Sequence, residues 1–390
     1  FKMLKKILCM VLSAAMLMGI LCACGNTKTD DGKNSGNTVF KIGSIGPTTG
    51  DAAEYGNAVM NAAQLAVDEI NAAGGINGYK VEFMSADDMG DAQKAVNAYN
   101  DLKDKGMQIL MGTVTSTPCM TVAENTHDDN MFMLTPSGSA VECVKYDNAF
   151  RVCFSDPNQG IASADYIADQ KLGTKIAVIY DSSNAYSAGI YEKFKSEAAA
   201  KNLTLVSETA FTKDSNKDFT VQLQQAKSAG ADLLFLPIYY TEASLILSQA
   251  NKMGYAPKMF GVDGMDGILK VKNFDTKLAE GVVLLTPFAA DAKDELTQKF
   301  VNSYKTKFGD IPNQFGADAY DAIYIIKAAI EKAGVTPDQS VSDICNALKT
   351  AMTQIKVDGV TGLGMTWTAE GEPNKSPKGM VIKNGEYVAM

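Results

Sequence analysis

The sequence predicts an α/β protein with two doubly wound lobes, each built on a parallel sheet with helices on both faces. Short β-branched or aliphatic runs alternate with longer amphipathic segments, which is the pattern of parallel strands joined by helices. The alternation falls into two separate blocks. The part of the chain from Val39 to Met390 is also long enough for two domains.

The first block opens with a strand at Phe40–Ile45 and a long helix at Tyr55–Ala73. Apolar side chains recur every three or four residues along this helix, so they share one face. Gly74-Gly75 ends it, because glycine adopts the left-handed conformation that closes helices. The elements expected next are the strand Tyr79–Met84, the helix Ala92–Lys105, the strand Gln108–Met111, the helix Pro118–Asp129 and the strand Met131–Leu134.

The second block repeats the alternation. Its expected elements are the strand Lys175–Tyr180, the helix Tyr186–Lys201, the strand Leu203–Ser207, the helix Asp218–Ala229, the strand Asp232–Leu236 and the helix Thr241–Met253. Doubly wound proteins bind ligands at the carboxyl ends of their strands, and domain interfaces are frequent binding sites. We therefore expect a ligand cleft between the strand ends of the two lobes.

The chain begins with the features of an exported lipoprotein. Three lysines precede an uncharged apolar run that leads to Leu21-Cys22-Ala23-Cys24, as in secretory signals. This motif resembles a lipoprotein cleavage site, so residues 1–23 are predicted to be a signal peptide and Cys24 the lipidated N-terminus. The alternative is an uncleaved membrane helix, since the apolar run is only a little shorter than the roughly 20 residues that span a bilayer.

Residues 24–38 are predicted to be a flexible tether. After Cys24 they consist of Gly, Asn, Asp, Lys, Ser and Thr, which cannot bury enough apolar surface to fold. A Gly-rich coil of this length reaches on the order of 20 Å. A globular body held so close to a membrane is placed to pass something to a membrane protein.

Charge and histidine content exclude several functions. The chain has 36 Lys and Arg residues against 45 Asp and Glu, a formal net charge of −9, which argues against a nucleic-acid partner. Its one histidine, His127, lies in a polar helical stretch. No Ser-His-Asp triad can form without it, and a metal site with two histidines cannot form at all. We interpret His127 as a surface residue and expect no catalytic residues, no cofactor and no metal.

The folded part contains four cysteines, Cys119, Cys143, Cys153 and Cys345, with no CxxC pair, which argues against a zinc or redox site. An exported protein can oxidise its thiols. Cys143 and Cys153 flank a Tyr-Asp-Asn turn, which suggests a disulfide between them. The alternative is that the cysteines are buried free thiols that pack as small apolar side chains.

Two hydroxyl-rich segments follow predicted strands. Gly112-Thr113-Val114-Thr115-Ser116-Thr117-Pro118 follows one strand, and Thr135-Pro136-Ser137-Gly138-Ser139-Ala140 follows the next. Ser or Thr before a helix is a common N-cap, and Pro118 suits the first helical position, so ordinary capping explains part of the first segment. Free N–H groups and hydroxyls at a helix start also bind carboxylates or phosphates. Adjacent ends of parallel strands are expected to bring the two segments together.

At these residues the chain resembles the branched-chain amino-acid (Leu/Ile/Val) substrate-binding proteins of ABC transporters. The resemblance covers essentially all of residues 39–390. It is most specific in two segments, Ile42-Gly43-Ser44-Ile45-Gly46-Pro47-Thr48-Thr49-Gly50 and Gly74-Gly75-Ile76-Asn77-Gly78. It continues through Leu134-Thr135-Pro136-Ser137, Phe150-Arg151 and Asp156-Pro157-Asn158-Gln159-Gly160.

The resemblance implies a type I periplasmic-binding fold with two lobes joined by three crossovers. We expect the crossovers near Asp156, Pro287 and Gly362. The N-terminal lobe is then formed by residues 39–155 plus 288–362, and the C-terminal lobe by residues 156–287 plus 363–390.

The resemblance also implies the ligand-binding residues. The carboxylate-binding serine of the family falls on Ser116, beside Thr117, and Ser139 would complete that contact. Ser137 would offer its carbonyl to the ligand ammonium, and Asp263 would be the acidic partner from the other lobe. Asp263 stands where the best-known relatives have Glu, which is one methylene longer, so either the lobes close further or a water intervenes. The remaining cleft residues implied are Tyr55, Tyr186, Tyr239 and Phe315, each of which has rim or core packing as its alternative role.

Arg151, the single arginine of the chain, could clamp a carboxylate, since guanidinium groups bind carboxylates through two hydrogen bonds. Its place in a strand that leads to the first crossover favours an ion pair that stabilises the lobe.

These observations predict an extracytoplasmic receptor, monomeric and anchored to the cell membrane by lipid. It would bind an amino acid, most simply an aliphatic or branched-chain one, and deliver it to the ABC permease. A sensor of the same fold that signals to a membrane receptor, or a receptor for an amide or carboxylate, is the alternative. A surface hydrolase would need a base for Ser116, and none is apparent.

Overall fold

The computed structural model describes residues 38–390. The predicted signal peptide, Cys24 and all of the tether except Thr38 lie outside the described residues. Within them, no helix combines the length and the apolar character needed to cross a membrane.

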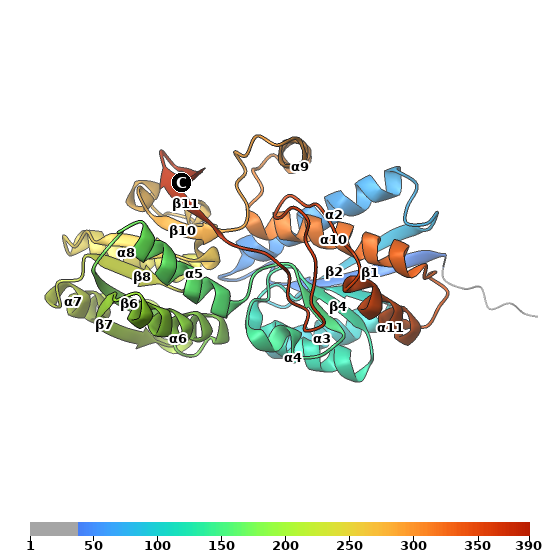
Figure 1. Ribbon diagram of the computed structural model, residues 1–390, viewed down its shortest axis with the longest axis horizontal. Helices are drawn as coiled ribbons and strands as arrows, with labels where there is room; N and C mark the ends of the chain where they lie inside the picture. Colours follow the sequence, from blue (N-terminus) through green and yellow to red (C-terminus); the bar gives the residue numbers. More distant parts are fainter. Residues whose placement is uncertain (1–37) are drawn as a thin grey trace, which may run out of the picture. The chain divides into compact units, whose positions relative to one another are not determined.

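The first lobe contains a five-stranded parallel sheet in the order β2-β1-β3-β4-β5 (Figure 1). Helices join successive strands, and two later helices, α10 and α11, return to this lobe. Its elements are β1 (Val39–Gly46), α2 (Ala53–Ala72), β2 (Lys80–Asp87), α3 (Ala92–Asp104), β3 (Ile109–Met111), α4 (Ser116–Asp128), β4 (Phe132–Thr135), β5 (Ala149–Arg151), α10 (Gln314–Ala333) and α11 (Val341–Met352).

The second lobe contains a seven-stranded sheet in the order β12-β11-β10-β9-β8-β6-β7. Five of its strands are parallel, and β11 and β12 add an antiparallel edge that the sequence pattern did not predict. Its elements are α5 (Asp156–Asp169), β6 (Lys175–Asp181), α6 (Ala185–Ala200), β7 (Thr204–Phe211), α7 (Thr220–Ser228), β8 (Leu233–Leu236), α8 (Tyr240–Lys252), β9 (Lys258–Gly261), β10 (Val283–Thr286), β11 (Lys378–Lys383) and β12 (Glu386–Ala389). Between β10 and α10 lies α9 (Glu295–Phe308).

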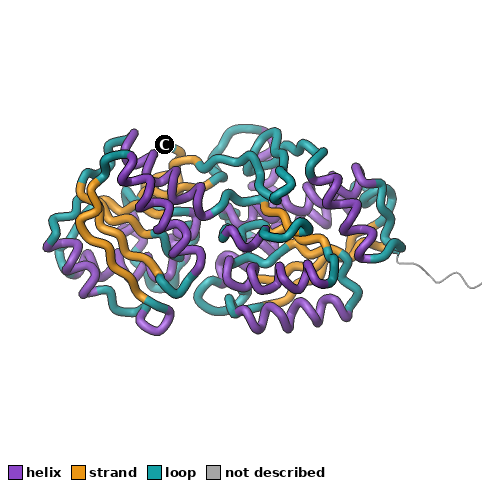
Figure 2. The backbone as a smooth tube through the Cα atoms, turned by 60° about the horizontal axis from the view of Figure 1, so that its bottom comes forward, coloured by secondary structure: helices purple, strands orange, loops and turns teal. Residues whose placement is uncertain are grey.

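Helices cover both faces of each sheet, as expected for a doubly wound fold (Figure 2). In β3, Ile109 and Met111 belong to the core that includes α2 and α10, whereas Leu110 packs with α3 and α4. In β8, Leu234 and Leu236 face α7 and α8, whereas Leu233 and Phe235 face α5 and α6. Successive strand residues point to opposite faces, so a strand buried on both sides is apolar throughout.

Every predicted strand and helix is present, and most ends agree closely. The clearest differences are that β7 continues to Phe211 instead of ending at Ser207, and that β2 continues to Asp87 instead of ending at Met84. Exposed positions alternate with less exposed ones in the second half of β7, and β7 lies at an edge of its sheet. This half-exposed pattern is why its full length was missed.

The chain passes between the lobes after β5, again after β10, and finally before β11. The exact lobe boundaries stay a prediction, but the contacts of residues 363–375 move the third crossover. Trp367 Nε1 donates to the carbonyl of Arg151 in β5 (2.7 Å), and Lys375 Nζ forms a buried ion pair with Asp318 in α10 (2.7 Å). This segment therefore packs on the first lobe, and the expected crossover at Gly362 is better placed after Lys375.

Candidate ligand-binding site

The two hydroxyl-rich segments lie side by side, as expected for adjacent strand ends. The N-cap of α4 is Thr115, whose side chain makes no capping bond. Ser116, the first residue of α4, accepts hydrogen bonds at Oγ from the backbone N–H groups of Ser139 (3.2 Å) and Ala140 (3.3 Å). Because this oxygen already accepts two N–H groups, the Ser116 hydroxyl proton is left to donate elsewhere.

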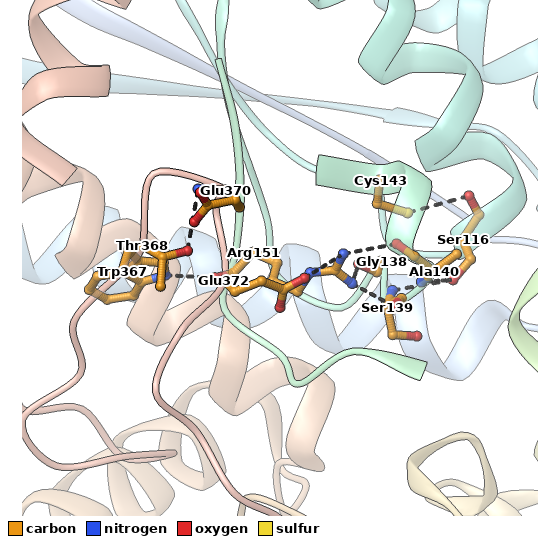
Figure 3. Close-up of polar contacts among 10 residues, drawn as sticks. All are labelled: Ser116, Gly138, Ser139, Ala140, Cys143, Arg151, Trp367, Thr368, Glu370 and Glu372. Atoms are coloured by element: carbon orange, nitrogen blue, oxygen red, sulfur yellow. Dashed lines mark hydrogen bonds and ion pairs between the residues drawn. The ribbon is translucent and has the colours of Figure 1, made fainter. Parts of the chain in front are cut away.

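Arg151 binds the backbone of the second hydroxyl-rich segment, at residues 138–140 (Figure 3). Its guanidinium donates to the carbonyls of Gly138 (3.1 Å), Ser139 (2.5 Å) and Ala140 (2.9 Å). It also forms an ion pair with Glu372 (3.3 Å). Burial lowers the pKa of the guanidinium, but Cys153 and Glu372, with smaller contributions from Cys143 and Asp156, raise it above its usual value. The expected ion pair is confirmed, and the guanidinium positions the 138–140 loop.

Asp263 is the acidic group of the second lobe. It starts a short 3-10 helix, Asp263–Met265, that follows β9. Tyr186 Oη donates to Asp263 Oδ1 (2.5 Å) and accepts the N–H of Gly264 (2.8 Å). Burial raises the pKa of the Asp263 carboxyl to about 7, since the hydrogen bonds from Tyr186 and Gln159, which lower it, do not compensate for lost water.

Two glutamines that the sequence analysis did not assign hold Asp263 in place. Gln159 Oε1, on α5, accepts the N–H of Asp263 (3.3 Å), and Gln314 Nε2, on α10, donates to the Asp263 carbonyl (2.9 Å). Gln159 stands inside the Asp-Pro-Asn-Gln-Gly segment quoted above, and Gln314 precedes Phe315. These neighbours, which the resemblance to the family had already marked, are the sequence feature that could have identified both glutamines.

Aromatic rings form the walls between the two lobes. Tyr55, on α2, lies against Phe315 with ring centres 4.1 Å apart and against Tyr239 at 5.4 Å. Its hydroxyl donates to the carbonyl of Gly264. A side chain added at Gly264 would lie 2.5 Å from the Tyr186 hydroxyl, so only glycine allows this approach.

One inner cavity brings together seven of the nine expected residues: Tyr55, Ser116, Ser137, Tyr186, Tyr239, Asp263 and Phe315. Val114, Thr115 and Gly264, which were not expected, complete the lining. The cavity measures about 10 Å³, which is room for about one water molecule. A larger ligand can be admitted only when the lobes or the aromatic side chains move apart.

Thr117 and Ser139 lie outside this inner cavity. Thr117 is exposed and lines a separate outer cavity of about 360 Å³, which shares Thr115, Tyr186 and Tyr239 with the inner one. Ser139 is buried behind Ser116, beside Asp156. Ser139 therefore acts on the inner cavity through its backbone N–H, which positions Ser116, and Thr117 lies at the mouth of the cleft.

Asp156 is a second buried carboxyl near the cavity. It begins α5 and is about 1% exposed, and neither carboxyl oxygen has a hydrogen-bond partner among residues 38–390. Burial and the nearby Asp263 raise the pKa of Asp156 well above its usual value, although Ser139 and Arg151 act in the opposite direction. Asp156 therefore places a second carboxyl close to Asp263, outside the lining of the inner cavity.

The expected Cys143–Cys153 disulfide is not formed. Cys119, Cys143, Cys153 and Cys345 are all free and buried. Cys143 Sγ donates to the carbonyl of Ser116 (3.7 Å), so it points toward α4, away from the turn that suggested the pairing. The alternative, buried thiols that pack as apolar side chains, describes these residues.

His127 is exposed and stacks on Tyr146, with ring centres 4.3 Å apart. This position confirms its interpretation as a surface residue. Among residues 38–390, no group of three or more His, Cys, Asp and Glu side chains is arranged to hold a metal ion.

Known proteins have a similar fold and a related sequence. The chain is 32% identical over 303 residues to Leu/Ile/Val-binding protein homolog 3 of Brucella melitensis, covering 77% of this chain and 80% of the relative. Its structure matches the substrate-binding protein LivJ of Streptococcus pneumoniae, solved in complex with isoleucine, with a TM-score of 0.82 and 26% identity over 90% of this chain and 98% of the other.

A leucine-binding protein, LivK, of Thermotoga maritima matches with a TM-score of 0.81 and 26% identity, at the same coverage of both chains. The family model described as periplasmic binding protein matches residues 39–385. This match spans the first sheet, every strand of the second sheet except β12, and every residue of the inner cavity. The chain therefore belongs to the periplasmic binding protein family.

Proposed function

We propose that this protein is a lipid-anchored, extracytoplasmic receptor that binds an aliphatic α-amino acid between its lobes and delivers it to an ABC importer. The observation that carries this proposal is the chemistry of the inner cavity. The Ser116 hydroxyl and the start of α4 stand on one side of it, and the Asp263 carboxylate on the other. A carboxylate suits the first side, and an ammonium group suits the second.

The apolar part of the ligand would contact the rings of Tyr55 and Phe315 and the side chain of Val114. These side chains offer no charged partner, which favours an aliphatic amino acid over a charged one. The relatives point the same way, since the Brucella protein is named for Leu, Ile and Val and the Streptococcus structure holds isoleucine.

A receptor role accounts for the site better than catalysis does. A serine nucleophile needs an adjacent base to take its proton. The Ser116 oxygen accepts two backbone N–H groups, and His127 lies exposed against Tyr146. Charge-assisted hydrogen bonds in a closed cleft would instead hold a ligand unchanged until the lobes reopen.

Lipid attachment at Cys24, the membrane location and the monomeric state are part of the proposal and rest on the sequence. A tether of residues 24–38 would allow the folded body to reach a permease in the same membrane. Replacement of Cys24 by Ala should release the protein into the medium or leave an uncleaved precursor. An unmodified Cys24 peptide in the membrane fraction, detected by mass spectrometry, would disprove the anchor.

Isothermal titration with leucine and two truncated analogues tests the ligand class. Both 4-methylpentanoate, which lacks the ammonium group, and 3-methylbutylamine, which lacks the carboxylate, should bind at least about a hundredfold more weakly than leucine, because each leaves one buried polar partner without a counterpart. Equal binding of 4-methylpentanoate and leucine would point to a carboxylate receptor. Leucine uptake into vesicles that carry the cognate permease then distinguishes import from sensing.

A further inference from the structure

The structure contains a second, larger cavity on the hinge side of the lobes, separate from the ligand cleft. It measures about 460 Å³, within the range of small-molecule sites. Residues of both lobes line it: Asp266–Lys270 and the β11–β12 turn come from the second, and the approach to α10 comes from the first. None of the residues of the inner cavity lines it.

The walls of this hinge cavity are mainly apolar. The side chains that provide this character are Leu269, Leu284, Phe288, Val301, Ile311 and Pro312. Ile311 is 48% exposed, so its side chain is free to contact an occupant. An occupant with a small branched apolar body would cover this surface.

The charged groups of the cavity are predominantly acidic. Asp266, Asp291, Asp310 and Glu386 line it, against one cation, Lys270. Lys270 already pairs with Glu54 (2.7 Å) and Asp310 (2.5 Å). Asp266 is only 6% exposed, and no ion pair among residues 38–390 includes it. A cationic group on the occupant would supply the charge that Asp266 lacks.

A second buried polar side chain of the cavity has one atom without a hydrogen-bond partner in the described part of the chain. Asn313 caps α10 through Oδ1, which accepts the N–H of Gly316 (3.0 Å), while its Nδ2 has no hydrogen-bond partner among the described residues. Asn313 is 8% exposed and lines the hinge cavity. Buried donors are almost always paired, so this group calls for an acceptor oxygen beside the apolar surface.

We propose that the hinge cavity is a second binding site, for a small apolar amine that also carries a hydroxyl or carbonyl oxygen. Its ammonium group would pair with Asp266, its oxygen would accept from Asn313 Nδ2, and its branched carbon chain would lie against Leu284 and Phe288.

Gln314 connects the hinge cavity to the ligand cleft. Gln314 donates from its backbone N–H to Asp266 Oδ2 (2.9 Å) and from its side chain to the carbonyl of Asp263 (2.9 Å). An occupant that bridges both lobes would favour their present arrangement. Where the proposed amino-acid function holds, it would therefore raise the affinity of the cleft, and the amino acid would raise the affinity of the hinge cavity equally.

The test is calorimetric titration of the Asp263→Asn protein with 2-amino-4-methylpentan-1-ol, a branched amino alcohol. This background disables the proposed cleft contact with an ammonium group, so the experiment does not depend on the proposed function. We expect binding in the millimolar range, at least about tenfold tighter than that of 4-methylpentan-1-ol or 4-methylpentanoate, which lack the amine. Equal binding of the three compounds, or none up to about 10 mM, would overturn the proposal.

Matched variants locate the site. Ala290 lines the hinge cavity and Ala292 does not, and both are half-buried in the same connection. In the same Asp263→Asn background, Ala290→Trp should weaken binding of the amino alcohol at least about tenfold by filling the cavity, and Ala292→Trp should leave it unchanged. If Ala290→Trp fails to fold, Val301→Trp fills the cavity from α9. Binding that survives the filling variant places the compound elsewhere and overturns the proposal.

Discussion

The two faces of the inner cavity are built in different ways. The face of the first lobe consists of neutral hydroxyl and N–H groups at two adjacent strand ends, with Arg151 buried behind them. The face of the second lobe carries a carboxyl, Asp263, held by Tyr186, Gln159 and Gln314 from three different helices. The charged group of the first face, Arg151, does not line the cavity, whereas that of the second face, Asp263, does.

This difference teaches how one cleft can fit both ends of a zwitterion. A cation placed directly at the first face would pair with a carboxylate ligand but would also face Asp263 across a narrow space. Arg151 does not line the cavity. Its guanidinium instead donates to three backbone carbonyls of the 138–140 loop and pairs with Glu372. The N–H groups that these peptides present to Ser116 remain as neutral donors. We predict six outcomes from this contrast.

Replacement of Asp263 by Ala should have the largest effect on ligand binding. It removes the carboxyl at the cavity, so a buried ammonium group loses its partner, at a cost of about 3–5 kcal/mol in binding free energy. Titration calorimetry with leucine measures this change, with Asp263→Glu as the control that restores the charge. Undiminished leucine binding by Asp263→Ala would show that the second face does not hold the ammonium group.

Replacement of Arg151 by Met should mainly reduce stability. The carbonyls of the 138–140 loop lose their donor in a buried place, and Glu372, whose side chain is 33% exposed, loses its partner. We expect the free energy of unfolding in urea to fall by about 2–4 kcal/mol. Glu372→Gln keeps the bonds to the loop and should cost clearly less. Equal losses of stability in the two variants would mean that Arg151 stabilises the protein through its ion pair with Glu372 and not through its bonds to the loop.

Replacement of Ser116 by Ala should weaken leucine binding by about 1.5–3 kcal/mol, the range for a hydrogen bond to a charged group. The ligand-free protein should also lose about 1 kcal/mol of stability, because the N–H groups of Ser139 and Ala140 lose their acceptor. Thr117→Ala, at the exposed mouth of the cleft, is the matched control and should change affinity by less than about 0.5 kcal/mol. A larger loss of affinity in Thr117→Ala would show that the ligand carboxylate binds at the mouth of the cleft and not at Ser116.

Ligand affinity should rise with pH up to neutrality. Asp263, with its pKa raised to about 7 in the ligand-free protein, must lose a proton to pair with an ammonium group, so affinity should increase about tenfold per pH unit below 7 and level off above it. Calorimetry in buffers of different ionisation enthalpy would detect the released proton. Asp263→Asn should abolish this dependence, and its persistence would assign the proton to Asp156 or another group.

The same carboxyl affects stability with the opposite sign. Its pKa rises from 3.8 to about 7 on folding, so the folded state binds more protons than the unfolded state between these values. Stability should therefore fall as pH rises through this window.

The smallest effect is expected outside the cavity, where the lobes touch directly. Thr241 Oγ1, at the start of α8, donates to the carbonyl of Asp51 before α2 (2.8 Å). Thr241→Val should weaken leucine binding by about 0.5–1.5 kcal/mol, since this bond exists only when the lobes are closed. Thr121→Val, which alters a bond within α4, should leave affinity unchanged. Equal binding by both variants would mean that closure depends on the ligand contacts alone.

The sequence by itself determined the fold class and the first face of the cavity. Apolar alternation located the strands and helices, and the segments around Ser116 and Ser137 are continuous stretches that follow adjacent parallel strands. Because neighbouring strands in such a sheet end at the same edge, local sequence was enough to predict that these hydroxyl groups meet.

Only the tertiary structure decided which residues hold Asp263 in place, which loop Arg151 binds and where the thiols lie. Asp263 meets Tyr186, Gln159 and Gln314 across 77, 104 and 51 positions of sequence, and the segment containing Glu372 returns to β5 from the end of the chain. Cys143 turns toward Ser116 because η1 (Val141–Val144) packs on α4, which short sequence spacing could not indicate. Contacts of this kind depend on how helices from separate crossovers pack, and local periodicity carries no information about that packing.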